Sequence, residues 1–259
     1  MLLEVKDLNI SLTSEKSVAE HISFRLGQGE MLSIVGSSGA GKTTICKAIM
    51  GLLGNAYRAD GEILFQGEDL LDLPERKRQT IYGKEICLIM QNPMTAFNPS
   101  IRVGRQMEKT YLLHHGKTPR QEMQRLFAAI LQKLGLEDTQ RILNSYPFTL
   151  SGGMLQRLMI AAALMCQPAL LVADEATTAI DACNRIGLMR ELKSFCKDGM
   201  SVLFVTHDLR SASVSDRILV MDRGRIVEQG KTEQILNTPK EDYTKYLLNA
   251  CRLERREMS

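Results

Sequence analysis

Residues 31–44 read MLSIVGSSGAGKTT, and this stretch decides the fold. Its first five residues are the kind of apolar run that forms a strand buried on both faces. The residues after Thr43 continue as a helix to about residue 53. Residues 36–43 match the pattern GxxxxGK[ST], whose glycines let backbone N–H groups turn inward around an anion at the positive end of a helix.

We therefore expect a phosphate-binding loop in which Lys42 contacts the β- and γ-phosphates of a nucleotide and Thr43 offers its hydroxyl to Mg²⁺. The residues assigned to this loop are Gly36, Ser37, Ser38, Gly39, Ala40, Gly41, Lys42, Thr43 and Thr44.

Further short apolar runs predict more strands of the same sheet, at residues 85–90, 169–173, 201–205 and 217–221. Residues 170–175, LLVADE, end in two acids. Asp174 is placed to hold Mg²⁺, directly or through water, and Glu175 is the candidate general base for an attacking water.

Two more polar residues follow predicted strands. His207 comes after the strand at 201–205 and is expected to contact the γ-phosphate. Gln91 follows the strand at 85–90, and its amide can reach both Mg²⁺ and the attacking water. Taken singly these are weak signals, but together with the two acids they predict one nucleotide site at the strand ends.

The sequence between residues 92 and 164 has a different character. Residues 118–136 place apolar side chains on one helical stripe, with Thr118 as a cap, Pro119 at the first position and Gly135 at the end. We expect one α/β domain with a mostly parallel sheet. Residues 1–91 and 165–259 form its nucleotide-binding core with a small antiparallel sheet, and residues 92–164 form an inserted helical subdomain.

Ser151, Gly152 and Gly153 begin an apolar helix inside that insertion. Free N–H groups and a hydroxyl at a helix start suit a phosphate. Because these residues lie on the other side of the chain's own loop, we expect them to cap the ATP of a second, similar subunit. Two chains arranged head to tail would then enclose two ATP molecules.

The bulk composition excludes several classes of protein. The net charge of +3 gives no argument for nucleic acid as a partner. Six cysteines lie far apart, which argues against a disulfide framework or a cysteine metal site. No apolar run reaches the ~20 residues that span a bilayer, and the N-terminus reads as a strand rather than a signal peptide. These features favour a cytosolic location.

Across its whole length the chain resembles the ATP-binding subunits of ABC transporters. The resemblance rests on residues 36–43, Gln91, LSGGMLQR, LLVADE, Asp181 in TTAID and His207, which occur in the family's order and spacing. It implies the ABC ATPase fold, ATP-driven dimer closure and hydrolysis-driven opening. It also implies a peripheral position on the cytoplasmic face of the membrane, on permease subunits that Gln91 and the helical subdomain would contact, with Asp181 at the dimer seam near the nucleotide.

A narrower resemblance is to the peptide and nickel importers, carried by MQNPMTAFNP at 90–99 and SYPFTLSGGMLQRLMIAAAL at 145–164. These stretches are most similar to importers of nickel and of metal–metallophore complexes, and importers of oligopeptides or dipeptides are the alternative. The group implies a second ATPase subunit, a sister chain in preference to a copy of this one, and an extracytoplasmic solute-binding protein as an indirect partner.

The chain also departs from the family. Leu12 stands where many members have an aromatic residue that stacks on adenine, so we expect weak binding of ATP by the lone subunit. Ala176 replaces a proline after the candidate base, and Thr149 precedes LSGG where peptide importers tend to have glutamate.

Two other functions are compatible with a nucleotide-binding cassette. The first is a soluble ABC-type ATPase of DNA repair or ribosomes, which needs a long coiled coil or a second cassette. The second is a cassette that binds ATP but turns it over poorly. We disfavour the first because this sequence shows neither element, and the second because every reacting residue is present.

Overall fold

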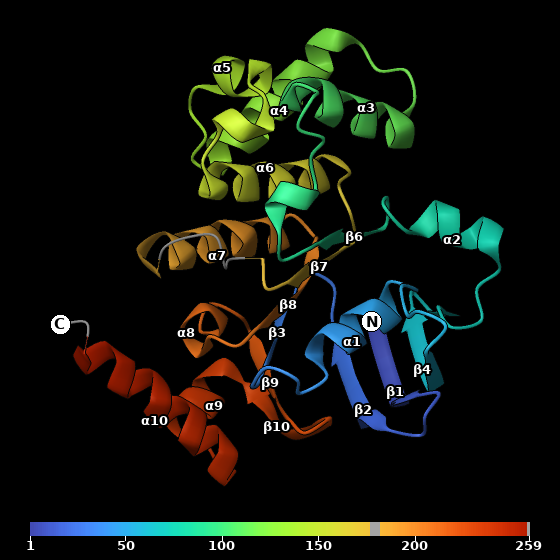
Figure 1. Ribbon diagram of the computed structural model, residues 1–259, viewed down its shortest axis with the longest axis vertical. Helices are drawn as coiled ribbons and strands as arrows, with labels where there is room; N and C mark the ends of the chain where they lie inside the picture. The colour runs from blue at the N-terminus through green and yellow to red at the C-terminus, as the bar shows by residue number, and fades with distance from the viewer. Residues whose placement is uncertain (177–181, 258–259) are drawn as a thin grey trace.

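The computed structural model describes residues 1–176 and 182–257, and within them a six-stranded sheet forms the centre of the molecule (Figure 1). The strand order is β10-β9-β3-β8-β7-β6. Their bounds are β3 Met31–Val35, β6 Ile86–Ile89, β7 Leu170–Asp174, β8 Ser201–Thr206, β9 Arg217–Asp222 and β10 Arg225–Lys231. β3, β6, β7, β8 and β9 pair in parallel and β10 pairs antiparallel with β9, which confirms the mostly parallel α/β sheet.

A second, antiparallel sheet has the order β2-β1-β4-β5 and is built mainly from N-terminal residues. Its strands are β1 Leu3–Leu12, β2 Ser17–Leu26, β4 Tyr57–Phe65 and β5 Glu68–Asp69. Helix α1, Lys42–Ile49, shares one hydrophobic cluster with this sheet and with one face of the central sheet. The helix ends four residues earlier than the sequence predicts, and Gly51 just beyond it takes a left-handed conformation with φ +63°.

The segment that follows β6 is helical and lies at one end of the molecule, away from the antiparallel sheet (Figure 1). It comprises η1 Pro93–Thr95, α3 Val103–His115, α4 Arg120–Lys133, α5 Thr139–Asn144, η2 Pro147–Thr149 and α6 Gly152–Met165. We call α3 to α6 the helical lobe. In α4 the predicted cap at Thr118 is wrong, since Pro119 holds the cap position and no side chain bonds the first amides there. Gly135 does end the helix, with φ +69°.

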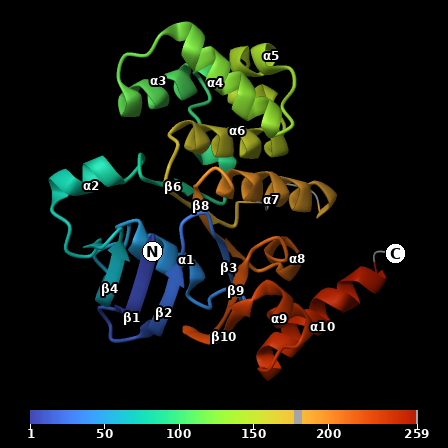
Figure 2. The same cartoon turned by 180° about the vertical axis from the view of Figure 1, so that it is seen from behind.

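The remaining helices are α2 Glu75–Ile81, α7 Ala182–Cys196, α8 Leu209–Ala212, α9 Thr232–Asn237 and α10 Asp242–Glu257. Seen from behind, α10 lies beside α8 and α9 at the end of the molecule opposite the helical lobe (Figure 2). Among the described helices, none combines the length and the apolarity that crossing a bilayer requires.

The two faces of β7 belong to different hydrophobic clusters. Leu171 and Ala173 pack with the helical lobe, whereas Leu170 and Val172 pack with α1 and the antiparallel sheet. This is the alternation that a strand buried on both faces imposes. Strand β7 is therefore fixed from both sides before it ends at Asp174.

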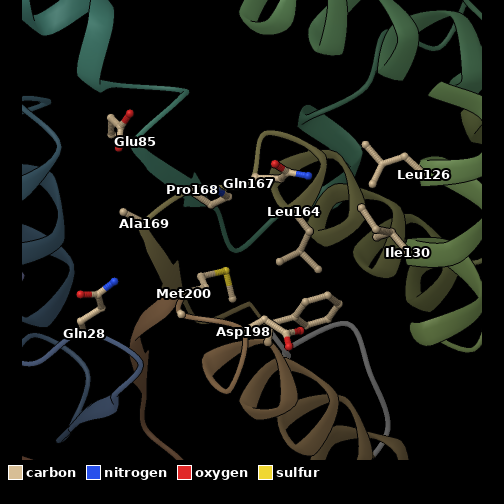
Figure 3. Close-up of a pocket in the computed structure, with 12 residues that line it drawn as sticks. Gln28, Glu85, Leu126, Ile130, Leu164, Gln167, Pro168, Ala169, Asp198 and Met200 are labelled. Carbon is tan, nitrogen blue, oxygen red and sulfur yellow. The ribbon is translucent and has the colours of Figure 1, made fainter. Parts of the chain in front are cut away.

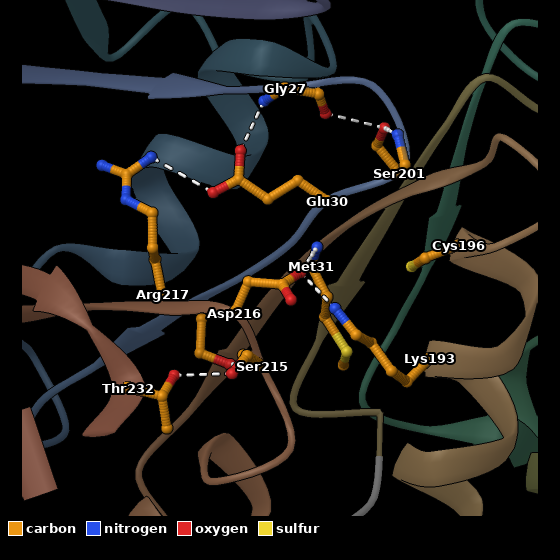
Figure 4. Close-up of polar contacts among 12 residues, drawn as sticks. Gly27, Glu30, Met31, Lys193, Cys196, Ser201, Ser215, Asp216, Arg217 and Thr232 are labelled. Atoms are coloured by element: carbon orange, nitrogen blue, oxygen red, sulfur yellow. Dashed lines mark hydrogen bonds and ion pairs between the residues drawn. The ribbon is translucent and has the colours of Figure 1, made fainter.

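A polar network holds the amino-terminal ends of the central strands (Figure 4). The Asp216 carboxylate accepts a hydrogen bond from the Met31 amide at 2.8 Å and pairs with Lys193. The Ser201 hydroxyl donates to the Gly27 carbonyl at 2.9 Å, and Arg217 pairs with Glu30 at 3.2 Å. With these ends tied to one another, the carboxyl ends at the opposite edge are held in a fixed register.

Candidate active site

The loop between β3 and α1 is closely enclosed by its neighbours. A Cβ atom on Gly36 would lie 2.2 Å from the Met221 carbonyl oxygen of β9. Gly41 has φ +94°, and a Cβ there would lie 2.8 Å from the Val18 carbonyl oxygen of β2. Both positions therefore exclude a side chain. The loop tip at residues 37–39 is exposed, whereas Ala40 and Gly41 are buried.

Lys42 is the first residue of α1 and is only 5% exposed. Its ammonium donates hydrogen bonds to the carbonyls of Gly36 and Ser37, both at 2.8 Å, so the side chain lies inside the curve of the loop. Burial lowers the pKa of Lys42, and the nearby carboxylates of Glu175 and Asp174 oppose that shift. Thr44 follows on the first turn of the same helix.

Thr43 joins the loop to the end of β7. Its hydroxyl donates to the Asp174 carboxylate at 3.1 Å. Burial raises the pKa of Asp174, the hydrogen bond from Thr43 works against that shift, and the negative charge of Glu175 adds to it. A partly buried carboxylate of this kind gains from a cation placed beside it.

Glu175 connects three strand ends. Its carboxylate accepts a hydrogen bond from the Gln91 amide nitrogen at 2.8 Å, and its other oxygen lies 3.2 Å from Nδ1 of His207. Its backbone amide donates to the Val205 carbonyl of β8 at 2.9 Å. The backbone of Glu175 is left-handed, with φ +48°, a conformation that a non-glycine residue adopts only at a cost.

The structure thus brings together six predicted side chains: Lys42, Thr43, Gln91, Asp174, Glu175 and His207. Among the described residues, no cluster of three or more His, Cys, Asp and Glu side chains could hold a metal ion by itself. One carboxylate and one hydroxyl nevertheless fit Mg²⁺, which usually takes few protein ligands and completes its shell with phosphate oxygens and water.

The predicted residues of the insertion lie apart from this cluster. We call Ser151, Gly152 and Gly153 the Ser151 corner. Ser151 caps α6, its hydroxyl accepting a hydrogen bond from the Met154 amide at 3.3 Å, and both Ser151 and Gly152 are exposed. No interaction recorded in the described part of the chain joins the corner to the loop at residues 36–43. Asp181 lies outside the described residues.

The structure also reveals a contact that the sequence did not predict. The Ser37 amide donates a hydrogen bond at 3.1 Å to the hydroxyl of Tyr243 in α10. The sequence gives no signal for this pair, because 206 positions separate the two residues and the C-terminal stretch predicts only a helix that frays into charged residues.

A cavity of about 540 Å³ lies elsewhere, at the amino-terminal edge of the central sheet (Figure 3). Apolar side chains of the helical lobe and α7 line it, among them Leu126, Ile130 and Phe195, with Glu85 and Asp198 also on its wall. None of the predicted site residues contributes to it. The six predicted side chains around Glu175 lie at the opposite edge of the sheet, where the parallel strands end.

The sequence was compared with known families and curated proteins. A family model described as ABC transporter matches residues 19–178. The metal-staphylopine import system ATP-binding protein CntD of Staphylococcus aureus is 40% identical over 251 residues, which cover 96% of this chain and 92% of that protein. The oligopeptide transport ATP-binding protein OppD of Bacillus subtilis is 41% identical over 254 residues, which cover 95% and 71%.

Solved structures agree in fold. The ATP-binding cassette MJ0796, a dimer in a post-hydrolysis state bound to ADP and Pi, matches with a TM-score of 0.78 at 26% identity. The match covers 89% of this chain and 99% of that one. An ATP-binding subunit of an ABC transporter matches with a TM-score of 0.77 at 27% identity, over 97% of this chain and 100% of that one.

Proposed function

The chain belongs to the ABC transporter family, in its group of peptide and nickel importers, and we propose that it hydrolyses ATP to drive uptake of a chelated transition metal ion. The observation that carries the ATPase role is the arrangement around Glu175. Its carboxylate lies between Gln91 and His207, and the neighbouring Asp174 is bonded to the loop that holds Lys42.

In this proposal the loop amides and Lys42 bind the β- and γ-phosphates, the glycines leaving room for close approach. Thr43, Asp174 and Gln91 would hold Mg²⁺, which when bound would supply positive charge against the phosphates. The first positions of α1 supply further donors through Thr43 and Thr44.

Glu175 accepts the proton of the water that attacks the γ-phosphate. Gln91 holds the carboxylate through its amide nitrogen at 2.8 Å. His207 lies against the other carboxylate oxygen and provides an imidazole N–H for the γ-phosphate. The base is thus oriented from two sides.

The Ser151 corner enters the proposal through a second cassette. A helix start with glycine amides is suited to the far side of a γ-phosphate, and within the described residues no hydrogen bond or ion pair joins the corner to the loop at 36–43. We propose that each nucleotide lies between the loop of one subunit and the Ser151 corner of the other, with Asp181 at the seam between them. The second cassette is a sister chain in preference to a copy of this one.

The remaining partners follow from the importer role. Transmembrane permease subunits bind the helical lobe and the region of Gln91, so the chain lies peripherally at the cytoplasmic face of the membrane. A solute-binding protein outside the cytoplasm delivers cargo and acts on this chain only through the permeases. Nucleic acid has no part in the cycle.

The proposal that the cargo is a metal rather than a peptide rests on two short stretches of sequence. The proposal for a metal is supported by the resemblance of the stretches MQNPMTAFNP and GGMLQR to nickel and metal–metallophore importers. The two relatives described above, one for a metal–staphylopine complex and one for oligopeptides, are 40% and 41% identical. Uptake of an oligopeptide or dipeptide is therefore the second candidate.

The test is uptake in a strain that lacks the chain, complemented with wild type, Glu175→Gln or the control Glu233→Gln. The control makes the same change at an exposed position of α9, outside the helical lobe. We expect wild type and the control to restore uptake of nickel supplied as a chelate, and Glu175→Gln to reduce it at least a hundredfold. If the strain without the chain lost uptake of peptides and kept uptake of nickel, the cargo would be a peptide. Full uptake with Glu175→Gln would show that Glu175 is not the base.

A further inference from the structure

Helix α10 contacts the phosphate loop directly. Tyr243 is the second residue of this helix, and its hydroxyl accepts the hydrogen bond from the Ser37 amide at 3.1 Å. Ser37 is the second residue after β3, at the point where the chain turns into the loop. Leu247 and Leu248 of the same helix pack on the cluster that contains Val35, the last residue of β3. The helix therefore lies against the base of the loop.

The start of α10 is fixed by strand β10. The two carboxylate oxygens of Glu228 accept hydrogen bonds from the amides of Lys240 and Glu241, at 2.8 and 3.2 Å. These amides immediately precede the helix, whose first turns then present Tyr243 toward the loop. The position of the Tyr243 hydroxyl is therefore set by the sheet rather than by a free tail.

A third contact joins α10 to the segment that carries His207. Arg210 of α8 donates a hydrogen bond to the Cys251 carbonyl at 2.7 Å. Asp208 caps α8 and also pairs with Arg185 of α7 at 3.2 Å. Since α8 begins at Leu209, two residues after His207, α10 spans the distance between the phosphate loop and the histidine segment.

Ser37 is held on both sides of its backbone. Its carbonyl accepts a hydrogen bond from Lys42, and its amide donates to Tyr243. The Lys42 ammonium has three N–H donors, and two of them bond the carbonyls of Gly36 and Ser37, which leaves one for a phosphate. The bond to Tyr243 keeps the first turn of the loop in place.

We propose that α10 clamps the nucleotide site and that Tyr243 is a positioning residue that keeps the phosphate loop in its binding conformation. The proposal rests on the proposed function, because it assigns Tyr243 a part in ATP binding by the same loop. A preformed loop binds more tightly because less backbone freedom is lost on binding. Tyr243 should affect the affinity for ATP and not the chemical step, because within the described residues it makes no hydrogen bond to the residues around Glu175.

The experiment compares Tyr243→Phe with Tyr246→Phe in the full chain, assembled with its second cassette and permeases. Phenylalanine keeps the ring that packs in the apolar cluster and removes only the hydroxyl. Tyr246 is a matched control on the same helix, 66% exposed, its ring stacked on that of Tyr243 at 6.4 Å. The measurements are KM for ATP, kcat and thermal stability.

We expect Tyr243→Phe to raise KM about three- to tenfold, the effect of losing one ordinary hydrogen bond, with kcat within about twofold of wild type. Tyr246→Phe should change neither value. An unchanged KM in Tyr243→Phe, or a fall in kcat at constant KM, would overturn the clamp. If the wild type itself failed to hydrolyse ATP, the proposed function would fall and the clamp with it, so the two failures are distinguishable.

Discussion

The phosphate loop before α1 and the Ser151 corner before α6 both place glycines and hydroxyls at the start of a helix, but their surroundings are opposite. The loop is enclosed by β2 and β9, crossed by a buried lysine and tied to β7 and α10. The Ser151 corner is exposed. Within the described residues, the Ser151 hydroxyl bonds only the Met154 amide of its own helix.

Under the proposed function, this difference means that one chain carries an enclosed half of one nucleotide site and an exposed half of another, which a second cassette has to complete. An enclosed loop with converging polar groups can hold phosphates unaided. An exposed helix start has the right donors but nothing opposite them, so water competes for each hydrogen bond. Substitutions in the two regions should therefore separate binding by one chain from turnover by two.

The largest effect is expected for Lys42→Ala. Removing the ammonium from inside the loop takes away a charge-assisted contact to the phosphates. ATP affinity of the single chain should fall at least tenfold, and hydrolysis by the assembled transporter about 10²- to 10³-fold. Binding is measured by titration calorimetry. Lys47→Ala, on the exposed side of the same helix, is the control. Wild-type affinity in Lys42→Ala would contradict the assignment of the loop.

A smaller and more selective effect is expected for Ser151→Glu. The new carboxylate would repel a γ-phosphate brought by the second cassette, so hydrolysis should fall about a hundredfold. ATP affinity of the single chain should stay within about twofold of wild type. The control Gln229→Glu adds the same charge at an exposed position of β10, outside the helical lobe. If Ser151→Glu weakened ATP binding by the single chain, the Ser151 corner would contact the nucleotide bound to the same chain. The contrast drawn between the two regions would then be wrong.

The smallest effect is expected for Leu12→Tyr, which concerns how tightly the built half-site binds alone. Leu12 ends β1, and the next strand, β2, passes against the loop at Val18. An aromatic ring that stacks on adenine is worth roughly 1–3 kcal/mol, so ATP affinity should rise about tenfold. The exposed Leu113→Tyr should leave it unchanged. A wild-type dissociation constant already in the low micromolar range would show that the missing ring does not matter.

The parts of the fold that the sequence predicts well are those set by short-range patterns. Residues 31–35 form β3 as expected, and the helix predicted at 118–136 is α4 with Gly135 ending it. Residues 21–26, HISFRL, alternate apolar and polar side chains as a strand does, but β2 begins four residues earlier because Ser17 and Ala19 pair with β1. The alternation of apolar and polar residues along one strand does not show which residues pair with a neighbouring strand, so the start of β2 could not be predicted.

The site shows the same division. The proximity of four strand-end residues could be predicted because parallel strands end at one edge of a sheet; they are Gln91, Asp174, Glu175 and His207. The hydrogen bond from Ser37 to Tyr243 could not, because it depends on where β10 and Glu228 set the start of α10. The γ-phosphate that the Ser151 corner would meet is bound by a second subunit in the proposal. Its position therefore cannot be predicted from the fold of one chain.

Strand β7 links the helical lobe to the chemistry by the shortest possible path. Ala173, buried in the lobe's cluster, is the residue immediately before Asp174. One extended residue spans only about 3.3 Å, and the strand is closely packed on both faces. A mechanical load applied to the lobe from outside would reach the Asp174 carboxylate, the proposed ligand of Mg²⁺, through stiff, buried backbone, with no slack segment in between to absorb it.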